Sequence, residues 1–109
     1  MTLNELRDEC HAIARSKGWY DGPGERNIGE QLMLIVTEVA EAMEDLRDEK
    51  MTMSVDVAGK PIGFPSEIAD VLIRVFDLAG YLRIDLDSAV EAKMKFNQRR
   101  SYRHGGKAA

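Results

Sequence analysis

The segments 35-IVTEVAEAMEDL-46 and 64-FPSEIADVLIRV-75 decide how this chain folds, because each places a pair of acids in an apolar helical pattern. These acids are, in chain order, Glu38, Glu41, Glu67 and Asp70. Residues three apart are neighbours on a helix surface, so each pair projects from one side of its helix. Two such pairs on facing helices can therefore converge.

Both segments are predicted to bury an apolar stripe and to hold the acids at its edge. Helical periodicity of about 100° per residue aligns the apolar side chains of each segment. The first stripe consists of Ile28, Leu32, Ile35, Val39, Ala42 and Leu46, and the second of Phe64, Ile68, Val71, Val75, Leu78 and Leu82. The acids fall on the flank of each stripe. We therefore expect four carboxylates to border a helix–helix interface.

Four carboxylates in one place repel one another, and burial raises their pKa values unless a cation neutralises them. Ligand sets made only of oxygen suit Mg²⁺ or Mn²⁺ rather than zinc. A ferritin-type diiron centre would need Glu-x-x-His pairs, and neither His11 nor His104 stands in one. The alternative reading is that these acids are half-solvated side chains on ordinary amphipathic helices.

Length and composition indicate one small globular domain over residues 1–109. The chain is 44% apolar and 31% charged, and no apolar run approaches the roughly 20 residues of a membrane span. No signal peptide opens the sequence. We therefore expect a cytoplasmic protein that does not bind a membrane. The single cysteine, Cys10, is predicted to be a buried structural thiol.

Charge is distributed unevenly along the chain. Six basic residues and no acid lie between Lys93 and Lys107, which leaves nine basic and 19 acidic residues elsewhere, a net charge of −10. An acidic body with a basic end fits a polyanionic small ligand held by both a metal and cations. It fits nucleic acid poorly, because the body would repel the phosphate backbone. Residues 98–109 are expected to form a flexible basic segment.

Periodicity and capping residues predict four helices. Thr2 and Glu5 form a capping-box pattern before a helix that ends near Lys17, and Asn27 can cap a second helix that reaches about Lys50. A third begins near Pro65 and ends near Gly80 or Leu82, and Asp85 can cap a fourth through about Gln98. The inward residues of this fourth helix are expected to be Leu86, Ala89, Val90, Met94 and Phe96.

The helical period disappears between Met51 and Phe64, where apolar and polar residues alternate around a turn at 58–61. A short β-hairpin or irregular flap is predicted there, and it would join the two acidic helices as an antiparallel pair. The expected fold is an all-α, four-helix bundle with this small insertion.

Two further side chains can contact a ligand, and a third can contact the acids. Trp19, in a Gly- and Pro-rich loop, can plug the end of the bundle or stack on a nucleobase. Gln31 shares the flank of the acids one to two turns earlier. Arg74 shares the flank of the second pair, where it can orient a carboxylate or form an i, i+4 pair with Asp70.

The acidic double motif resembles that of the MazG-like, all-α nucleoside triphosphate pyrophosphohydrolases. Glu-x-x-Glu is followed, after a gap of 25 residues, by Glu-x-x-Asp. The neighbouring stretches 27-NIGEQL-32 and 63-GFPSE-67 and the basic end from Lys93 to Lys107 also look like that group. The resemblance covers most of the chain from Gly18 onward.

The resemblance implies cleavage of a nucleoside triphosphate to the monophosphate and pyrophosphate, with Mg²⁺ (or Mn²⁺) as cofactor. The role it suggests is house-cleaning of the nucleotide pool. The same resemblance implies that the four acids are the metal ligands and catalytic residues. The residues expected to bind phosphates and sugar are Lys93, Asn97, Arg100 and Arg103. Trp19 and Tyr102 are candidates for the nucleobase.

The resemblance also implies a homodimer or tetramer, because many relatives build their site across chains. Some relatives carry an extra acid beside the first Glu of the motif, whereas Thr37 and Val39 flank Glu38 here. The general base is therefore left open among the four acids and Asp45. Three alternatives stand beside this reading: a phosphoribosyl-ATP pyrophosphohydrolase, a dUTP- or dCTP-specific hydrolase, and a helical module that binds metal or nucleotide without catalysis.

Overall fold

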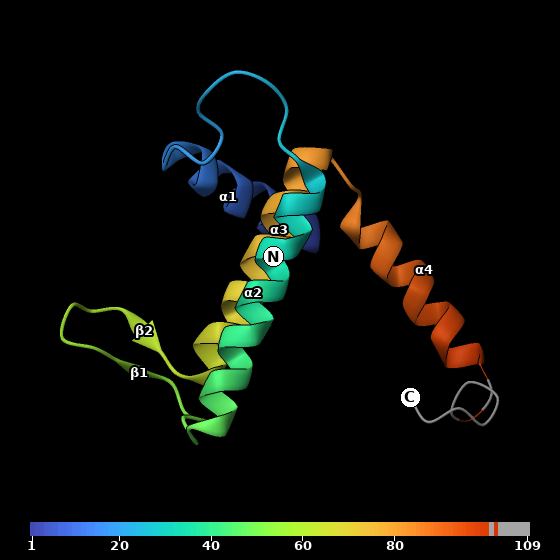
Figure 1. The fold of residues 1–109 in the computed structure, drawn as a ribbon. Coiled ribbons are helices and arrows are strands. Elements are labelled where there is room, and N and C mark those ends of the chain that lie inside the picture. Colours follow the sequence, from blue (N-terminus) through green and yellow to red (C-terminus); the bar gives the residue numbers. More distant parts are fainter. Residues whose placement is uncertain (101, 103–109) are drawn as a thin grey trace.

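The computed structural model describes residues 1–100 and Tyr102, and it is mostly helical (Figure 1). Its elements are α1 (Leu3–Ser16), α2 (Ile28–Arg47), β1 (Ser54–Val55), β2 (Pro61–Ile62), α3 (Phe64–Leu82) and α4 (Leu86–Arg99). The predicted all-α class, four helices and small hairpin are confirmed. Arg103 and most of the predicted basic end segment lie outside the described residues.

The predicted helix starts are confirmed by hydrogen bonds to the capping side chains. Thr2 and Glu5 form a reciprocal capping box on α1, and Asn27 accepts from the backbone N–H of Glu30. The Asp85 side chain accepts from the backbone N–H of Ser88 at the start of α4. Each bond satisfies a backbone donor that the first turn of a helix leaves unpaired.

The second helix ends at Arg47, three residues before the predicted end near Lys50. Glu49 adopts a left-handed conformation with φ of 59°. The backbone N–H of Lys50 then donates to the carbonyl of Asp45, and that of Glu49 to Leu46. This 6→1 and 5→2 pattern is a Schellman motif, which is usually formed with glycine at the left-handed residue. Because no glycine stands at this position, the end of the helix could not be located from the residue types.

The hairpin between α2 and α3 fixes their antiparallel arrangement. Its two strands pair Ser54 with Ile62 and Val55 with Pro61. At the end of the hairpin, the backbone N–H of Phe64 donates to the carbonyl of Lys50 at 2.8 Å, which ties the start of α3 to the end of α2. Gly63 has φ of 107°, and a Cβ there would collide with the Thr52 carbonyl, so glycine is required.

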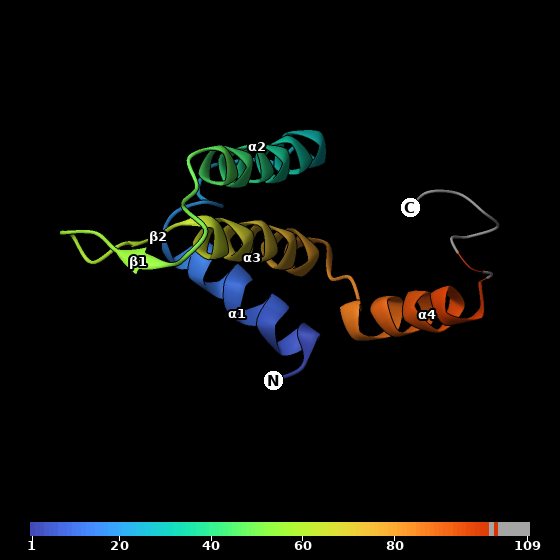
Figure 2. The same ribbon diagram turned by 90° about the horizontal axis from the view of Figure 1, so that it is seen from below.

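Helix α3 lies between α1 and α2, as Figure 2 shows from below. Gly80 allows α1 to approach closely, because a Cβ at this position would meet the Cβ of His11 at 2.6 Å. Helix α4 leads away from α2 and α3 in both views. It packs mainly against the start of α1, where the Asp87 carboxylate accepts from the backbone N–H groups of Leu3 and Asn4.

The expectation that all four helices pack into one bundle is therefore wrong for the single chain. The α4 side chains predicted to face inward include Val90, Met94 and Phe96, which are 39%, 59% and 52% exposed. Among the described residues, only the start of α4 packs on a neighbouring helix, α1, which leaves most of this apolar side exposed.

The predicted packing face of α2 is also rotated. The buried residues of α2 are Gln31, Glu38 and Ala42, so the acidic flank faces α3. Among the predicted stripe, Leu32, Val39 and Leu46 are about half exposed. The apolar face of α2, as we call it below, comprises Ile28, Leu32, Met33, Val36, Val39, Met43 and Leu46. Ala42 of the predicted stripe is buried and Ile35 is half-buried, so the face that packs on α3 lies between the predicted stripe and its acidic flank.

The apolar core of the described chain is correspondingly small. Only Ala42, Leu78 and Ala79 are buried apolar residues among those the structure describes. No helix in residues 1–100 is both long enough and apolar enough to cross a membrane.

Candidate metal and nucleotide site

Three of the four predicted acids come together between α2 and α3. Glu38, Glu67 and Asp70 each offer a carboxylate oxygen, and these atoms lie within 4.8 Å of one another. The i, i+3 spacing places Glu67 and Asp70 on the side of α3 that faces α2, and the antiparallel hairpin brings Glu38 opposite them. We call these three residues the carboxylate cluster.

Glu41 and Asp45 border the carboxylate cluster from the next turns of α2. Glu41 is exposed and is not one of the three clustered acids. Asp45 Oδ2 and Glu67 Oε2 are buried and have no hydrogen-bond partner among the described residues. Buried acceptors without partners cost free energy and are uncommon in native proteins. The α2–α3 interface therefore contains two buried acceptor oxygens that no described protein group satisfies.

The electrostatics of the carboxylate cluster are unfavourable in the absence of a cation. Burial raises the pKa of Glu67, and the carboxyl groups of Glu41, Asp70 and Asp45 raise it further. Burial also raises the pKa of Asp70, as does Glu38, while Lys60 and Arg74 act in the opposite direction. The carboxyl groups of Glu67 and Asp70 are thus harder to ionise than a free carboxyl group. This is expected of a metal site made of several acids when no ion is bound.

The donor set fits a hard divalent cation. All three clustered groups are carboxylates, which suit Mg²⁺, Mn²⁺ or Ca²⁺, and no cysteine or histidine belongs to the cluster. The unpartnered oxygen of Glu67 gives an independent sign that a ligand is needed here. The residues present therefore fit the metal that the sequence predicted, although they do not distinguish among the hard ions.

Arg74 is hydrogen-bonded to the carboxylate cluster. Its Nε donates to Glu38 Oε1 at 2.7 Å, and its guanidinium carbon lies 5.1 Å from the centroid of the Trp19 ring. Of the two roles predicted for Arg74, it takes the first, because it hydrogen-bonds to Glu38 on the neighbouring helix rather than to Asp70. The cluster thus has one cation in direct contact.

A pocket of about 400 Å³ extends from the carboxylate cluster toward α1. Its lining residues are Cys10, Ile13, Ala14, Lys17, Trp19, Glu38, Asp70, Ile73, Arg74 and Asp77. Trp19 is 45% exposed, so it does not plug the bundle end but forms one wall of this pocket. Cys10 is half-buried rather than fully buried, and burial raises the pKa of its thiol.

The remaining residues predicted to contact the ligand lie in different parts of the chain. Gln31 is buried on the side of α2 that faces α3. Lys93, Asn97 and Arg100 lie on or at the end of exposed α4, where Lys93 and Arg100 both contact the Phe96 ring. Within one chain the structure does not bring these α4 residues to the acids. Tyr102 is 85% exposed, and Arg103 is outside the described residues.

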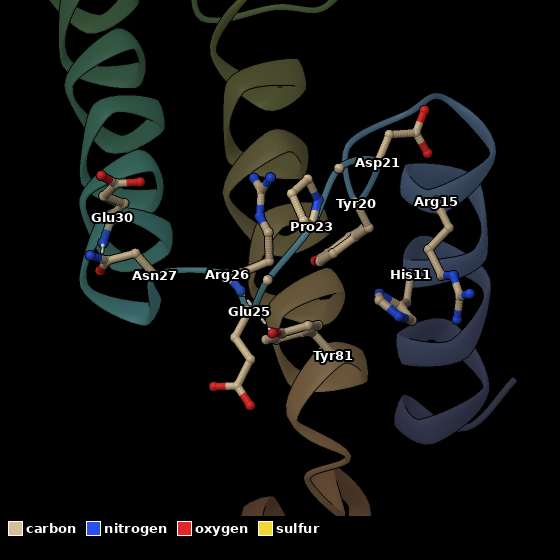
Figure 3. Close-up of a pocket in the computed structure, with 12 residues that line it drawn as sticks. His11, Arg15, Tyr20, Asp21, Pro23, Glu25, Arg26, Asn27, Glu30 and Tyr81 are labelled. Carbon is tan, nitrogen blue, oxygen red and sulfur yellow. Dashed lines mark hydrogen bonds between the residues drawn. The ribbon is translucent and has the colours of Figure 1, made fainter.

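A second pocket, of about 570 Å³, lies where α1 and α3 meet the loop before α2 (Figure 3). Tyr20 stacks on Tyr81 with ring centroids 5.2 Å apart, and His11 meets the edge of Tyr20 at 4.8 Å. His11 Nδ1 and the Tyr20 hydroxyl each lie 2.9 Å from the same oxygen of Asp77. Sequence reasoning missed this group, because its members are far apart in the chain and follow no motif spacing.

Comparison with known proteins gives one informative relative. The dCTP pyrophosphatase 1 of Bos taurus is 30% identical to the chain over 99 residues, which are 91% of this chain and 59% of that protein. The chain thus spans about three fifths of the length of the curated relative it matches. No protein-family model matches the chain, and no solved structure matches it.

Proposed function

We propose that this chain is a divalent-metal-dependent nucleoside triphosphate pyrophosphohydrolase of the MazG-like, all-α superfamily, with residues 1–109 as its single domain. The observation that carries the proposal is the carboxylate cluster, in which one oxygen from each of three acids on two helices lies within 4.8 Å of the others. One buried oxygen of Glu67 has no hydrogen-bond partner among the described residues. The similarity to a dCTP pyrophosphatase over 91% of the chain supports the same reaction class.

Glu38, Glu67 and Asp70, with Glu41 at their border, are the proposed metal ligands. When bound there, Mg²⁺ or Mn²⁺ would polarise phosphoryl oxygens and lower the pKa of an attacking water. The pocket beside the cluster is the proposed nucleoside site, where the Trp19 ring offers a stacking face worth about 1–3 kcal/mol per base. Glu41 and Asp45, which border the cluster, are the proposed acceptors of the water's proton.

A second copy of the chain is proposed to complete the site. Three observations support this: the apolar face of α2 is exposed, α4 has an exposed apolar side, and the α4 cations lie apart from the acids of their own chain. Burying the apolar face of α2 against a second copy would stabilise a homodimer or tetramer. It would also allow Lys93, Asn97 and Arg100 to approach the acids of the partner.

The assembly is tested by light scattering after size-exclusion chromatography. Val39→Lys places a charge at the centre of the apolar face of α2 and should yield a monomer, whereas the wild-type chain should elute as a dimer or tetramer. Glu44→Lys, on an exposed part of the same helix, serves as the matched charge control. A monomeric wild-type chain would contradict this part of the proposal.

The reaction is tested by incubating the pure protein and Mg²⁺ with a panel of nucleotides and identifying the products. The panel holds canonical and oxidised deoxynucleotides, dCTP, dUTP and phosphoribosyl-ATP. We expect nucleoside monophosphate and pyrophosphate in equal amounts, and rates on the last three separate the specific enzymes from a house-cleaning enzyme of the cytoplasm. Release of nucleoside diphosphate and orthophosphate would contradict the assignment.

A metal- or nucleotide-binding module without catalysis is the second candidate. It is favoured by the position of α4, whose cations do not reach the carboxylate cluster of their own chain. If this candidate were correct, Mg²⁺ and nucleotide would raise the thermal midpoint by mass action, yet the nucleotide panel would give no products.

A further inference from the structure

Arg74 contacts two side chains that the proposed function needs for binding the metal and the nucleobase. Its Nε donates to Glu38 Oε1 at 2.7 Å, and its guanidinium lies 5.1 Å from the Trp19 ring centroid. Both contacts are partly shielded, since the side chains of Arg74 and Glu38 are 28% and 11% exposed. One side chain therefore covers both a proposed metal ligand and the proposed stacking face.

The contact with Glu38 has a clear electrostatic reason. The Glu38 side chain is only 11% exposed and lies close to the carboxylates of Glu67 and Asp70, so a positive partner stabilises it. Arg74 supplies that partner across the α2–α3 interface, and the planar guanidinium can stack on an indole at the same time. The arginine thus does in part what a metal ion would do.

Arg74 and a metal ion compete for the same oxygen of Glu38. A carboxylate that ligates a divalent cation offers its lone pairs to the ion at about 2–2.6 Å, and the like charge of a guanidinium bonded to the same oxygen opposes this. The Trp19 ring is subject to the same conflict, because a nucleobase that stacks on the pocket side of the ring would meet the guanidinium.

We propose that Arg74 is a positioning residue that neutralises Glu38 in the metal-free site and leaves both Glu38 and the Trp19 ring when a divalent cation binds. Metal binding would thereby expose the stacking face, so that the ion and the nucleoside occupy the site in a favoured order. This inference rests on the proposed metal-binding role of the carboxylate cluster, and it adds that Arg74 gives up its two contacts when the metal binds.

The chain offers a direct reporter of this exchange, because Trp19 is its only tryptophan. Titrating the wild-type protein with Mg²⁺ in the absence of nucleotide should give a saturable change in indole emission as the guanidinium leaves the ring. Arg74→Met should bind Mg²⁺ roughly tenfold more tightly, as judged by calorimetry, because no internal cation competes for Glu38. In this variant the emission change should be lost.

Two further variants control the experiment. Arg74→Lys keeps the positive charge and should keep an Mg²⁺ affinity within about threefold of wild type, so it reports on competition even if Arg74→Met fails to fold. Arg47→Met, at the exposed end of α2, removes an arginine distant from Glu38 in sequence and should change neither affinity nor emission.

The inference is overturned if Mg²⁺ binds to the wild type without changing Trp19 emission, or if Arg74→Met binds Mg²⁺ more weakly than the wild type does. Either result can occur in a protein that hydrolyses nucleotides, which leaves the proposed function intact. Conversely, an Arg74-dependent emission change in a protein that yields no pyrophosphate would support the exchange and reject the enzyme.

Discussion

Helix α3 carries partly buried carboxylates on two sides, and the two groups differ in how completely their hydrogen bonds are satisfied. Toward α1, Asp77 Oδ1 accepts a hydrogen bond from the Tyr20 hydroxyl at 2.9 Å and lies 2.9 Å from His11 Nδ1. Toward α2, Glu67 has a buried oxygen without a partner among the described residues, and like charges surround it. The same helix thus contains a satisfied polar network and an unsatisfied one.

The difference separates a structural role from a functional one. A partly buried carboxylate with hydrogen-bond partners fixes the packing of its neighbours, as Asp77 does for α1 and the loop before α2. A group of buried carboxylates without partners destabilises the fold unless a ligand is bound, and such groups concentrate at functional sites. On this comparison, the α2–α3 interface is the place to expect metal chemistry, whereas the hydrogen bonds of Asp77 hold α1 and the loop before α2 in place.

Replacing Glu67 should produce the largest effect. Glu67→Gln keeps the size of the side chain but removes a proposed metal ligand, so we expect nucleotide hydrolysis to fall by roughly 1,000-fold. The variant should still fold, because it removes a charge that its neighbours repel. Glu44→Gln, at an exposed position of α2, is the matched control and should keep the wild-type rate. A Glu67→Gln enzyme as fast as wild type would remove this residue from the site.

Magnesium should stabilise the protein through the α2–α3 side alone. At a concentration of 100 times its Kd, a ligand that binds only the folded state adds about 2.7 kcal/mol. Scanning calorimetry should therefore show a higher midpoint with Mg²⁺, and addition of a chelator should reverse it. In Glu67→Gln the shift should disappear. A shift of equal size in this variant would place the metal elsewhere.

Loss of one hydrogen bond on the α1–α3 side should have a smaller effect, and only on stability. Tyr20→Phe removes the hydroxyl that donates to Asp77, which should lower the free energy of unfolding by about 1 kcal/mol in urea titrations. The Mg²⁺-induced shift should persist in this variant. Were Tyr20→Phe to abolish that shift, the two sides of α3 would not be separate units.

The smallest expected effect concerns the cap of α4, which lies outside both interfaces. Hydrogen bonds from Asn4 and Ser88 lower the pKa of Asp85 from 3.8 to about 2. A lowered pKa in the folded state stabilises the protein above pH 4, and this contribution is lost as the pH falls toward 2. Asp85→Asn should therefore flatten the dependence of stability on pH in that range. An unchanged pH profile would show that Asp85 does not contribute.

Local features of the fold could be predicted from the sequence, because they depend on neighbouring residues. The caps at Thr2, Asn27 and Asp85, the hairpin and the four helices follow from short-range patterns. The orientation of α2 could not be predicted in the same way. Its apolar stripe and its acidic flank are both clear in the sequence, but which residues of the two face α3 depends on packing between segments that are far apart in the chain.

The candidate site shows the same division. The i, i+3 spacing identified the acids that converge, of which Glu38, Glu67 and Asp70 lie together and Glu41 lies at the border. The Glu38 contact of Arg74 depends on a pairing across two helices, so spacing gave only the alternatives. The α4 residues were predicted from a resemblance to enzymes whose sites span chains, and a single chain does not test their role.

The most direct test of the central claim, that acids from α2 and α3 form a metal site, is electron paramagnetic resonance of Mn²⁺ titrated into the protein at pH 7. Bound Mn²⁺ loses its sharp six-line signal, so the free-ion signal reports binding. We expect wild type and Glu44→Gln to bind Mn²⁺ alike and Glu67→Gln to lose tight binding. Full free-ion signal in the presence of the wild-type protein, or equal binding by Glu67→Gln, would contradict the account.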